Sequence, residues 1–166
     1  MATSRGKQFE KIVQRDLNKV DNLLCERLHD ITSGYVNLNT PSDYIVYKNP
    51  NIYYLECKSI HGPSIPINNL IQLDRINTRI KDIYGAYGKF LIWFIDYKET
   101  FIVDATLLND YINREEYLIP YLDKEFKKSI NRKEFNDMCS NKVDGISLIP
   151  AQYKRIFPKF NFNNVF

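Results

Sequence analysis

The sequence predicts one mixed α/β domain, and three observations support this. A chain of 166 residues that is 44% hydrophobic and 26% charged is long enough to bury a core of its own. Short β-prone runs alternate with stretches in which apolar residues recur every three or four positions. One run, residues 89–95, is almost wholly apolar, which is typical of a strand covered on both faces. We expect residues 1–166 to form a single domain, with residues 1–4 as a frayed N-terminus and residues 150–166 as an aromatic C-terminal tail.

The first helix is predicted to begin at Arg5. Its apolar stripe would run for roughly six turns if the helix is unbroken, through Phe9, Val13, Leu17, Val20, Leu24 and Leu28. Glu10 lies near the beginning, where a solvated carboxylate complements the helix dipole. The periodicity breaks over residues 29–40, which predicts a turn at residues 32–34 and a short strand over residues 35–38.

Residues 41–58 contain the pattern around which the rest of the chain is interpreted. Residues 44–47 and 52–58 are β-prone, and the Lys-Asn-Pro-Asn segment between them is rich in turn-forming residues. The segment therefore predicts a β-hairpin. Alternation along its second strand places Tyr54, Glu56 and Lys58 on one face. Asp43, at the start of the first strand, would face them.

The types of these residues indicate a metal-dependent chemistry. Mg²⁺ prefers oxygen ligands and is often held by one or two carboxylates with water and substrate phosphate, so Asp43 and Glu56 are candidate ligands. A metal at this position would activate a water molecule and neutralise charge on a scissile phosphate. Lys58 would orient or deprotonate that water, or stabilise the negative charge of the transition state.

The second half of the chain predicts the remaining layers. A loop over residues 59–66 leads into a helix over residues 68–84, whose inward residues would be Leu70, Leu73, Ile76, Ile80 and Ile83. Gly85 and Gly88 are expected to end this helix before the apolar strand. A further strand is predicted over residues 100–103 and a helix over residues 105–117, with Pro120 preventing its continuation.

Pro41-x-Asp43 followed by Glu56-x-Lys58 resembles the PD-(D/E)XK nuclease signature. Other segments resemble, in the same order, segments of RecU-type Holliday junction resolvases, from about residue 5 to residue 148. They are Arg5-Gly6-Lys7 with Phe9-Glu10, Ser42-Asp43-Tyr44, Tyr54-Leu55-Glu56-Cys57-Lys58, Ile65-Pro66-Ile67-x-Asn69 and Lys128-Ser129-Ile130-x-Arg132-Lys133-Glu134.

This resemblance implies a restriction-endonuclease-like fold, in which a mixed central β-sheet is flanked by α-helices. It also implies a Mg²⁺-dependent endodeoxyribonuclease, with Mn²⁺ as a substitute, that resolves four-way DNA junctions as a homodimer by paired symmetric cuts in recombination and repair. Glu10 would then reach the metal site beside Asp43, Glu56 and Lys58. The backbone carbonyl of Cys57 would be a further metal ligand. Accessory roles are implied for Ser42 and for Gln72, whose place Asp74 would take in another register.

The chain also departs from this family. In RecU-type enzymes the interval that corresponds to residues 29–40 is longer and contains a protruding stalk, for which this sequence has little room. Two alternatives therefore remain open: a nuclease of the same superfamily that cuts flaps, nicked DNA or a specific duplex, and a non-catalytic DNA-binding module on the same fold.

Charge and composition indicate what the protein is expected to bind and where it is expected to act. The formal net charge is only +3, but lysines and arginines gather in segments where they would contact DNA phosphates. The candidates are Arg5, Lys7, Arg75, Arg79, Lys127, Lys128, Arg132 and Lys133. The sequence contains no apolar run of membrane-spanning length, so no membrane is expected as a partner. A nucleotide cofactor is not expected either. Three widely spaced cysteines predict free thiols and a cytoplasmic location. The phenylalanines of the tail predict either a docked segment or a partner surface.

Overall fold

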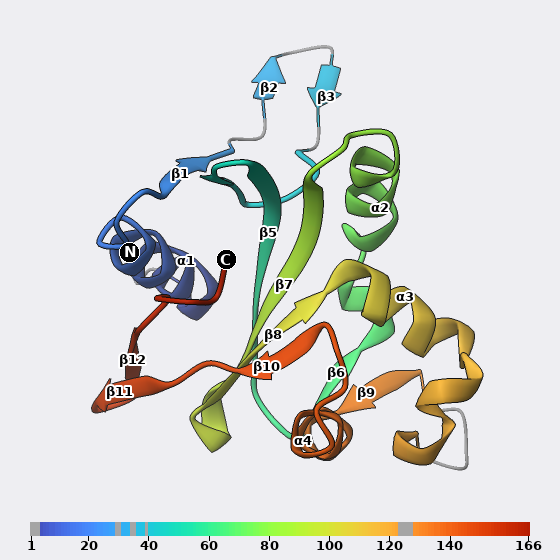
Figure 1. Ribbon diagram of the computed structural model, residues 1–166. Coiled ribbons are helices and arrows are strands. Elements are labelled where there is room, and N and C mark those ends of the chain that lie inside the picture. Colours follow the sequence, from blue (N-terminus) through green and yellow to red (C-terminus); the bar gives the residue numbers. More distant parts are fainter. Residues whose placement is uncertain (1–3, 29–30, 34–35, 39, 123–127) are drawn as a thin grey trace.

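The computed structural model describes residues 4–28, 31–33, 36–38, 40–122 and 128–166. Its centre is a six-stranded sheet in the order β1-β4-β5-β7-β8-β10 (Figure 1). Strands β5 and β7 pair in parallel and the other neighbours pair antiparallel, so the sheet is mixed, as predicted. Its strands are β1 (Leu24–Arg27), β4 (Tyr44–Lys48), β5 (Asn51–Ile60), β7 (Ala86–Phe94), β8 (Glu99–Asp104) and β10 (Ile146–Leu148).

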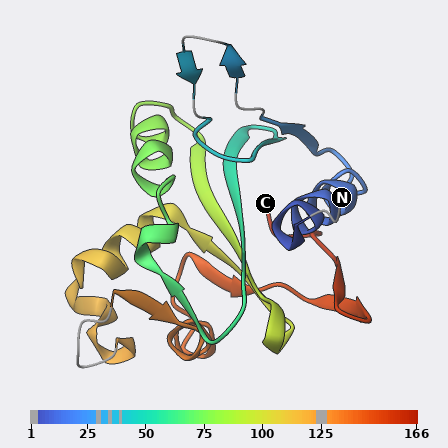
Figure 2. The same ribbon diagram turned by 180° about the vertical axis from the view of Figure 1, so that it is seen from behind.

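Helices cover both faces of this sheet, as the sequence predicts (Figure 1, Figure 2). Side chains alternate along β7: Phe90 and Ile92 belong to one buried cluster, while Leu91 and Trp93 belong to the other. The first cluster lies under the helices α2 (Leu73–Lys81), α3 (Ala105–Asn113) and α4 (Arg132–Ser140). The second lies under α1 (Arg5–Leu17) and the C-terminal segment. The apolar run is therefore the central strand with two covered faces that its composition indicated.

The remaining elements are short. Two-stranded sheets are formed by β2 (Ile31–Ser33) with β3 (Val36–Leu38), by β6 (Ser64–Pro66) with β9 (Ser129–Asn131), and by β11 (Ala151–Lys154) with β12 (Phe157–Phe160). The 3₁₀ helices are η1 (Ile67–Asn69), η2 (Ile95–Tyr97) and η3 (Glu116–Tyr121).

The predicted hairpin is confirmed. Strands β4 and β5 pair antiparallel with Tyr44 opposite Leu55 and Lys48 opposite Asn51. The face that carries Leu55 and Cys57 packs into the α1 cluster, whereas Tyr54 packs against the α2 cluster. Strand β5 thus has the two faces that its alternation predicted.

The prediction of one long N-terminal helix was wrong. Helix α1 ends at Leu17, and the chain then turns, with Asn22 in the left-handed region at φ 58°. Leu24 and Leu28 lie outside the helix, and Leu24 is exposed. Asparagine tolerates the left-handed conformation better than most residues, which lets the chain leave the helix and enter β1.

The interval after β1 agrees with its prediction in part: the short strand expected over residues 35–38 is present as β3, although residue 35 lies outside the described residues. Residues 32 and 33 belong to β2 rather than to a turn, whereas residue 34 lies outside the described residues. Strands β2 and β3 form a ribbon separate from the main sheet, which projects at the top of Figure 1. A short projecting ribbon therefore occupies the interval in which the sequence left little room for a stalk.

The second and third predicted helices exist but are shorter. Helix α2 ends at Lys81, so Ile83 lies outside it and is exposed. Gly88 lies within β7 instead of ending the helix. A Cβ atom at this glycine would lie 2.2 Å from Cγ2 of Ile76, so the missing side chain lets α2 pack directly on the sheet. Helix α3 ends at Asn113, where Arg114 adopts a left-handed conformation.

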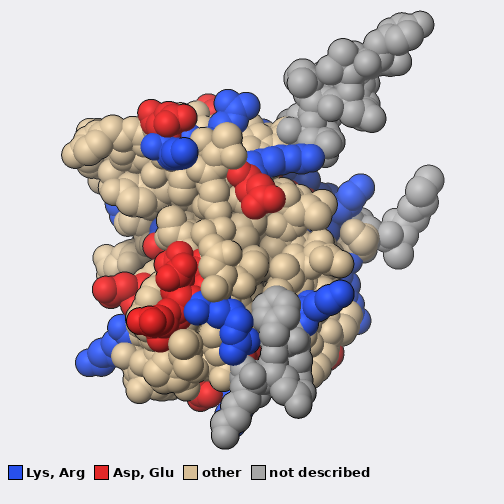
Figure 3. Space-filling view, turned by 90° about the vertical axis from the view of Figure 1, so that its right-hand side faces the viewer, with Lys and Arg blue, Asp and Glu red and all other residues tan. Residues whose placement is uncertain are grey.

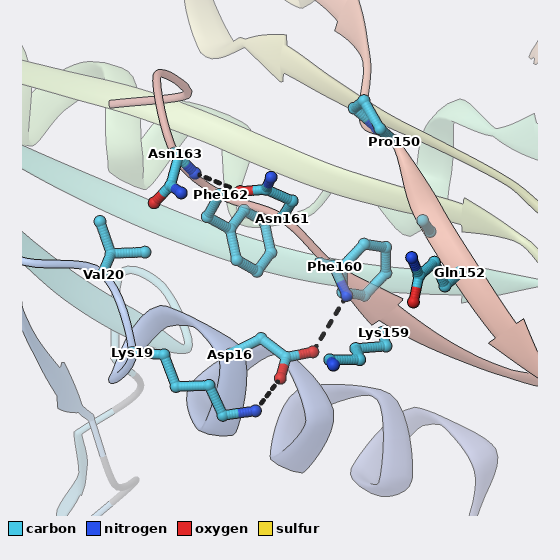
Figure 4. Close-up of a pocket in the computed structure, with 11 residues that line it drawn as sticks. Asp16, Lys19, Val20, Pro150, Gln152, Lys159, Phe160, Asn161, Phe162 and Asn163 are labelled. Atoms are coloured by element: carbon cyan, nitrogen blue, oxygen red, sulfur yellow. Dashed lines mark hydrogen bonds and ion pairs between the residues drawn. The ribbon is translucent and has the colours of Figure 1, made fainter.

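The C-terminal segment is docked, which decides between the two predictions for it. Phe160 and Phe162 are buried, and Phe157 and Phe166 pack against the same cluster as α1. The buried carboxylate of Asp16 fastens this segment to the helix. It accepts hydrogen bonds from Arg15 and Lys19 and, at 3.0 Å, from the backbone N–H of Phe160, beside a hollow of about 450 Å³ (Figure 4).

We expect Asp16→Asn to lower the free energy of unfolding by about 2 kcal/mol at pH 7, since it removes charge-assisted hydrogen bonds from a buried site. Burial alone raises the pKa of the Asp16 carboxyl, but the hydrogen bonds to it outweigh burial and hold that pKa below its usual value. A carboxyl with a depressed pKa stabilises the folded state above its unfolded pKa of about 3.9, and this contribution is lost as the pH falls further. Urea unfolding of the parent and the variant at pH 7 and pH 3 measures this contribution. A difference in the free energy of unfolding between the two proteins that is the same at both pH values would contradict the prediction.

All three cysteines are free, as predicted, and Cys25 and Cys57 are buried. Within the described residues, no helix is both long and apolar enough to cross a membrane.

Candidate active site

The predicted acidic pair meets where β4 begins. Because Tyr44 pairs with Leu55, the preceding residue, Asp43, lies opposite Glu56. Each carboxylate binds the backbone of the other strand: the Cys57 N–H donates to Oδ2 of Asp43 at 2.8 Å, and the Asp43 N–H donates to Oε2 of Glu56 at 3.1 Å. These reciprocal hydrogen bonds hold two carboxylates side by side on neighbouring strands.

Lys58 completes the cluster from the same face of β5. Its Nζ atom lies 2.8 Å from Oε1 of Glu56 and donates to Oε1 of Gln72 at 2.9 Å. The Glu56 side chain is 3% exposed and that of Lys58 is 19% exposed, so the ammonium group lies between a buried carboxylate and solvent. Of the two accessory candidates on the helix, the structure brings Gln72, at the N-cap of α2, to the site. Asp74 lies in the first turn of α2 and is exposed.

Glu10 reaches the same region from α1. Its carboxylate forms an ion pair with Arg27, and its backbone carbonyl accepts a hydrogen bond from the Tyr44 hydroxyl at 2.9 Å. Burial, followed by the charge of Asp43, raises the pKa of the Glu10 carboxyl, while Arg27 and Lys58 lower it. Glu10 is therefore close enough to Asp43 for their charges to interact.

The pKa of the Glu56 carboxyl is well above its ordinary value. Burial, followed by repulsion from Asp43, raises its pKa to about 7, although Lys58 opposes this shift. A buried carboxylate held beside a half-buried one is a functional-site signature, because the two negative charges destabilise one another.

The donor set fits a hard divalent cation. Asp43 and Glu56 supply carboxylate oxygens, the ligands that Mg²⁺ prefers, and a cation between them would relieve their repulsion. The N–H and C=O of one strand residue point to the same edge, so the Cys57 carbonyl faces the edge where its N–H meets Asp43. Among the described residues, no three side chains of His, Cys, Asp or Glu are grouped as a ready metal cage. The residues therefore fit an open metal site, whose remaining ligands would come from the backbone, water and substrate.

Ser42 is placed differently from the cluster residues. Its buried hydroxyl donates to the backbone carbonyl of Tyr44 at 2.9 Å, so it supports the turn that carries Asp43. Arg27, which pairs with Glu10, was missed by the sequence analysis. The residue was assigned to the long helix, whereas a strand assignment would have placed it opposite Tyr44 at the edge of the site.

The predicted DNA-contacting residues fall into separate groups. Arg5 and Lys7 lie on the first turn of α1. Arg75 and Arg79 are exposed on α2 and, with Pro41, line a hollow of about 280 Å³ beside the turn that leads to Asp43. Figure 3 shows the side of the molecule that carries α2 and α3, where basic and acidic side chains are interspersed.

The last group lies at β9 and α4. Lys128 and Lys133 are exposed there. The guanidinium of Arg132 forms an ion pair of 2.6 Å with Glu99 and stacks 4.2 Å from the ring centre of Tyr97, which gives it a structural partner. Lys127 lies outside the described residues.

No protein-family model matches the sequence, and no relative was found among curated proteins. The structure is similar to a 1.6 Å structure of Archaeoglobus fulgidus Hjc, a Holliday junction resolvase from an archaeal hyperthermophile. The sequences are 14% identical, the TM-score is 0.48, and the similarity covers 78% of this chain and 90% of that chain. A similarity at this level does not assign an activity to this chain.

Proposed function

We propose that this protein has a restriction-endonuclease-like fold and is a Mg²⁺-dependent DNA endonuclease that cuts four-way junctions. The observation that carries the proposal is the convergence of Asp43, Glu56 and Lys58 on one face of the β4–β5 hairpin, with Gln72 and Glu10 arriving from two helices. Five polar side chains meet where two carboxylates repel each other: two from β5, and one each from the start of β4, the N-cap of α2 and α1.

In this proposal Asp43, Glu56 and the Cys57 carbonyl hold the metal. Bound Mg²⁺, for which Mn²⁺ would substitute, supplies an activated water and neutralises charge on the scissile phosphate. Lys58 holds that water or its proton through Nζ, which Gln72 and Glu56 fix from two sides. Glu10 adds negative charge at the rim of the site, and Arg27 holds its carboxylate in place.

The remaining DNA would be bound by basic side chains around the cluster. Arg75 and Arg79 border the hollow beside Pro41, and Lys7 lies close enough to Glu10 to lower the pKa of its carboxyl. Contacts of this type position the backbone without reading sequence. Lys128 and Lys133 are exposed and would contact another part of the DNA backbone.

The choice of a four-way junction rests on the sequence resemblance to RecU-type resolvases. A junction has two strands to cut symmetrically, and a two-fold homodimer presents two identical sites to them. The free thiols agree with action in the cytoplasm, where cysteines stay reduced.

A supercoiled plasmid with an extruded cruciform tests paired cutting. Two coordinated cuts across the cruciform yield linear plasmid directly, whereas independent single cuts yield nicked circles first. We expect linear product with Mg²⁺ and none in EDTA. Nicked circles alone would contradict junction resolution, and no product with Mg²⁺ or Mn²⁺ would contradict nuclease activity altogether.

A further inference from the structure

A chain of three polar side chains links the start of α1 to the loop after β5 and to η2. Nη1 of Arg5 lies 3.4 Å from Nε2 of His61, and Nδ1 of His61 lies 2.8 Å from Oδ1 of Asp96. The other oxygen of Asp96 accepts the Gly62 N–H at 2.7 Å. The tautomer that satisfies both ring contacts has its proton on Nδ1 and accepts from Arg5 through Nε2.

This arrangement is exposed, so its contribution to stability is small. The side chains of His61 and Asp96 are 57% and 48% exposed, and ion pairs at such positions contribute little to folding. The geometry instead orients the imidazole: Asp96 holds the Nδ1 edge, so that the Nε2 edge points to Arg5. Hydrogen bonds from the Gly62 N–H and from His61 hold the pKa of the Asp96 carboxyl below its usual value, so that carboxyl stays ionised.

Strand β5 and helix α1 connect this cluster to the candidate active site. Strand β5 carries Glu56 and ends at Ile60, directly before His61, and α1 carries both Glu10 and Arg5. The four residue-to-residue steps along β5 from Glu56 to Ile60 span about 13 Å. A phosphate bound at His61 is therefore too far away to be the phosphate that is cleaved. The first turn of α1 packs near the end of β5, with the Cβ position of Gly6 3.8 Å from Oγ of Ser59.

We propose that Arg5 and His61, oriented by Asp96, bind a second, uncleaved backbone phosphate of the DNA. The inference rests on the proposed function, because it assigns a further contact to the same substrate. The phosphate oxygens would accept N–H groups of Arg5 and of the His61 ring, and Asp96 orients that ring through its contact with Nδ1. A phosphate held here fixes the register of the strand, and so determines which phosphate reaches Asp43 and Glu56.

The test measures binding of a labelled four-way junction in EDTA, where cleavage does not interfere, from 50 to 200 mM salt. We expect Arg5→Gln and His61→Ala each to raise Kd about 5- to 10-fold, the usual effect of one charge-assisted hydrogen bond. The double variant should raise Kd by less than the product of the two effects, since both groups hold one phosphate. Arg5→Gln should also reduce the slope of log K against log salt by about 1. Lys11→Gln, which removes a charge from an exposed position of the same helix, is the matched control and should have a smaller effect on both quantities.

Two further readouts separate this role from a purely structural one. Asp96→Asn should weaken junction binding about 3-fold while leaving the melting temperature within about 2 °C, because the group is exposed. Variants at Arg5 and His61 that bind with the affinity and salt slope of the parent would overturn the inference, even if the parent cuts junctions with Mg²⁺. A parent protein that binds no DNA would overturn the proposed function and this inference with it.

Discussion

Asp43→Asn is expected to reduce Mg²⁺-dependent DNA cleavage by about 10³-fold or more. Metal-ion catalysis supplies several kcal/mol of transition-state stabilisation, and each 1.4 kcal/mol corresponds to a factor of ten in rate. The substitution removes one of the two carboxylates that would hold the metal. It leaves an amide oxygen that can still accept the Cys57 N–H, so the hairpin should remain intact.

The same variant should bind junction DNA at least as tightly as the parent in EDTA, because one negative charge that repels phosphate has been removed. Cleavage is measured in single turnovers with enzyme in excess, and folding is checked by thermal melting. Asp21→Asn, which changes an exposed aspartate after α1, should cleave as the parent does. Equal cleavage by Asp43→Asn and the parent would refute the site assignment, whereas a parent with no activity would favour the DNA-binding module.

Lys58→Gln is expected to reduce the single-turnover rate by about 10²- to 10⁴-fold, the range of a positioned acid–base group. Glutamine keeps a donor for the buried Glu56 carboxylate, which an alanine would leave without a partner. Junction affinity in EDTA should change only a few-fold, because the lysine acts on the reacting atoms more than on the bound strand.

Gln72 is a positioning residue in this account, because its Oε1 atom contacts Lys58. Gln72→Ala should slow cleavage about 10-fold in the parent and have almost no effect in Lys58→Gln. Rates of the two single variants and the double variant form the test. Fully additive effects would show that Gln72 acts on the substrate independently of Lys58.

The parts of the fold that the sequence predicts best are those with local signals. The turn residues between β4 and β5, and the alternation along β5, are sufficient to place Glu56 and Lys58 on one face opposite Asp43. The apolar run of β7 predicts a central strand because no polar face interrupts it. In both cases a short segment determines its own conformation and burial.

The sequence predictions fail where contacts between residues far apart in the sequence determine the structure. The apolar spacing after Leu17 fits a longer helix as well as a turn and a strand, and only pairing with β4 selects β1. That pairing also brings Arg27 to Glu10, so the misplaced strand concealed an ion pair of the site. The choice of Gln72 over Asp74 depends on where α2 begins relative to Lys58, which no local pattern specifies.

The proposed substrate rests on the resemblance of the sequence to junction resolvases, whereas the proposed chemistry rests on the geometry of the site. The structure adds a projecting ribbon, β2 with β3, to an interval that is short in comparison with RecU-type enzymes. An experiment must therefore test the choice of substrate and the cleavage chemistry separately.

The most direct test is cleavage of a labelled immobile four-way junction beside flap and linear duplex DNA of the same sequence, with and without Mg²⁺. We predict cuts at symmetric positions in two strands of the junction, confined to the junction and dependent on the metal. Cutting of flap or linear DNA instead would retain the site and reassign the substrate. No cutting of any of the three with Mg²⁺ or Mn²⁺ would contradict the claim that Asp43, Glu56 and Lys58 form a phosphodiesterase site.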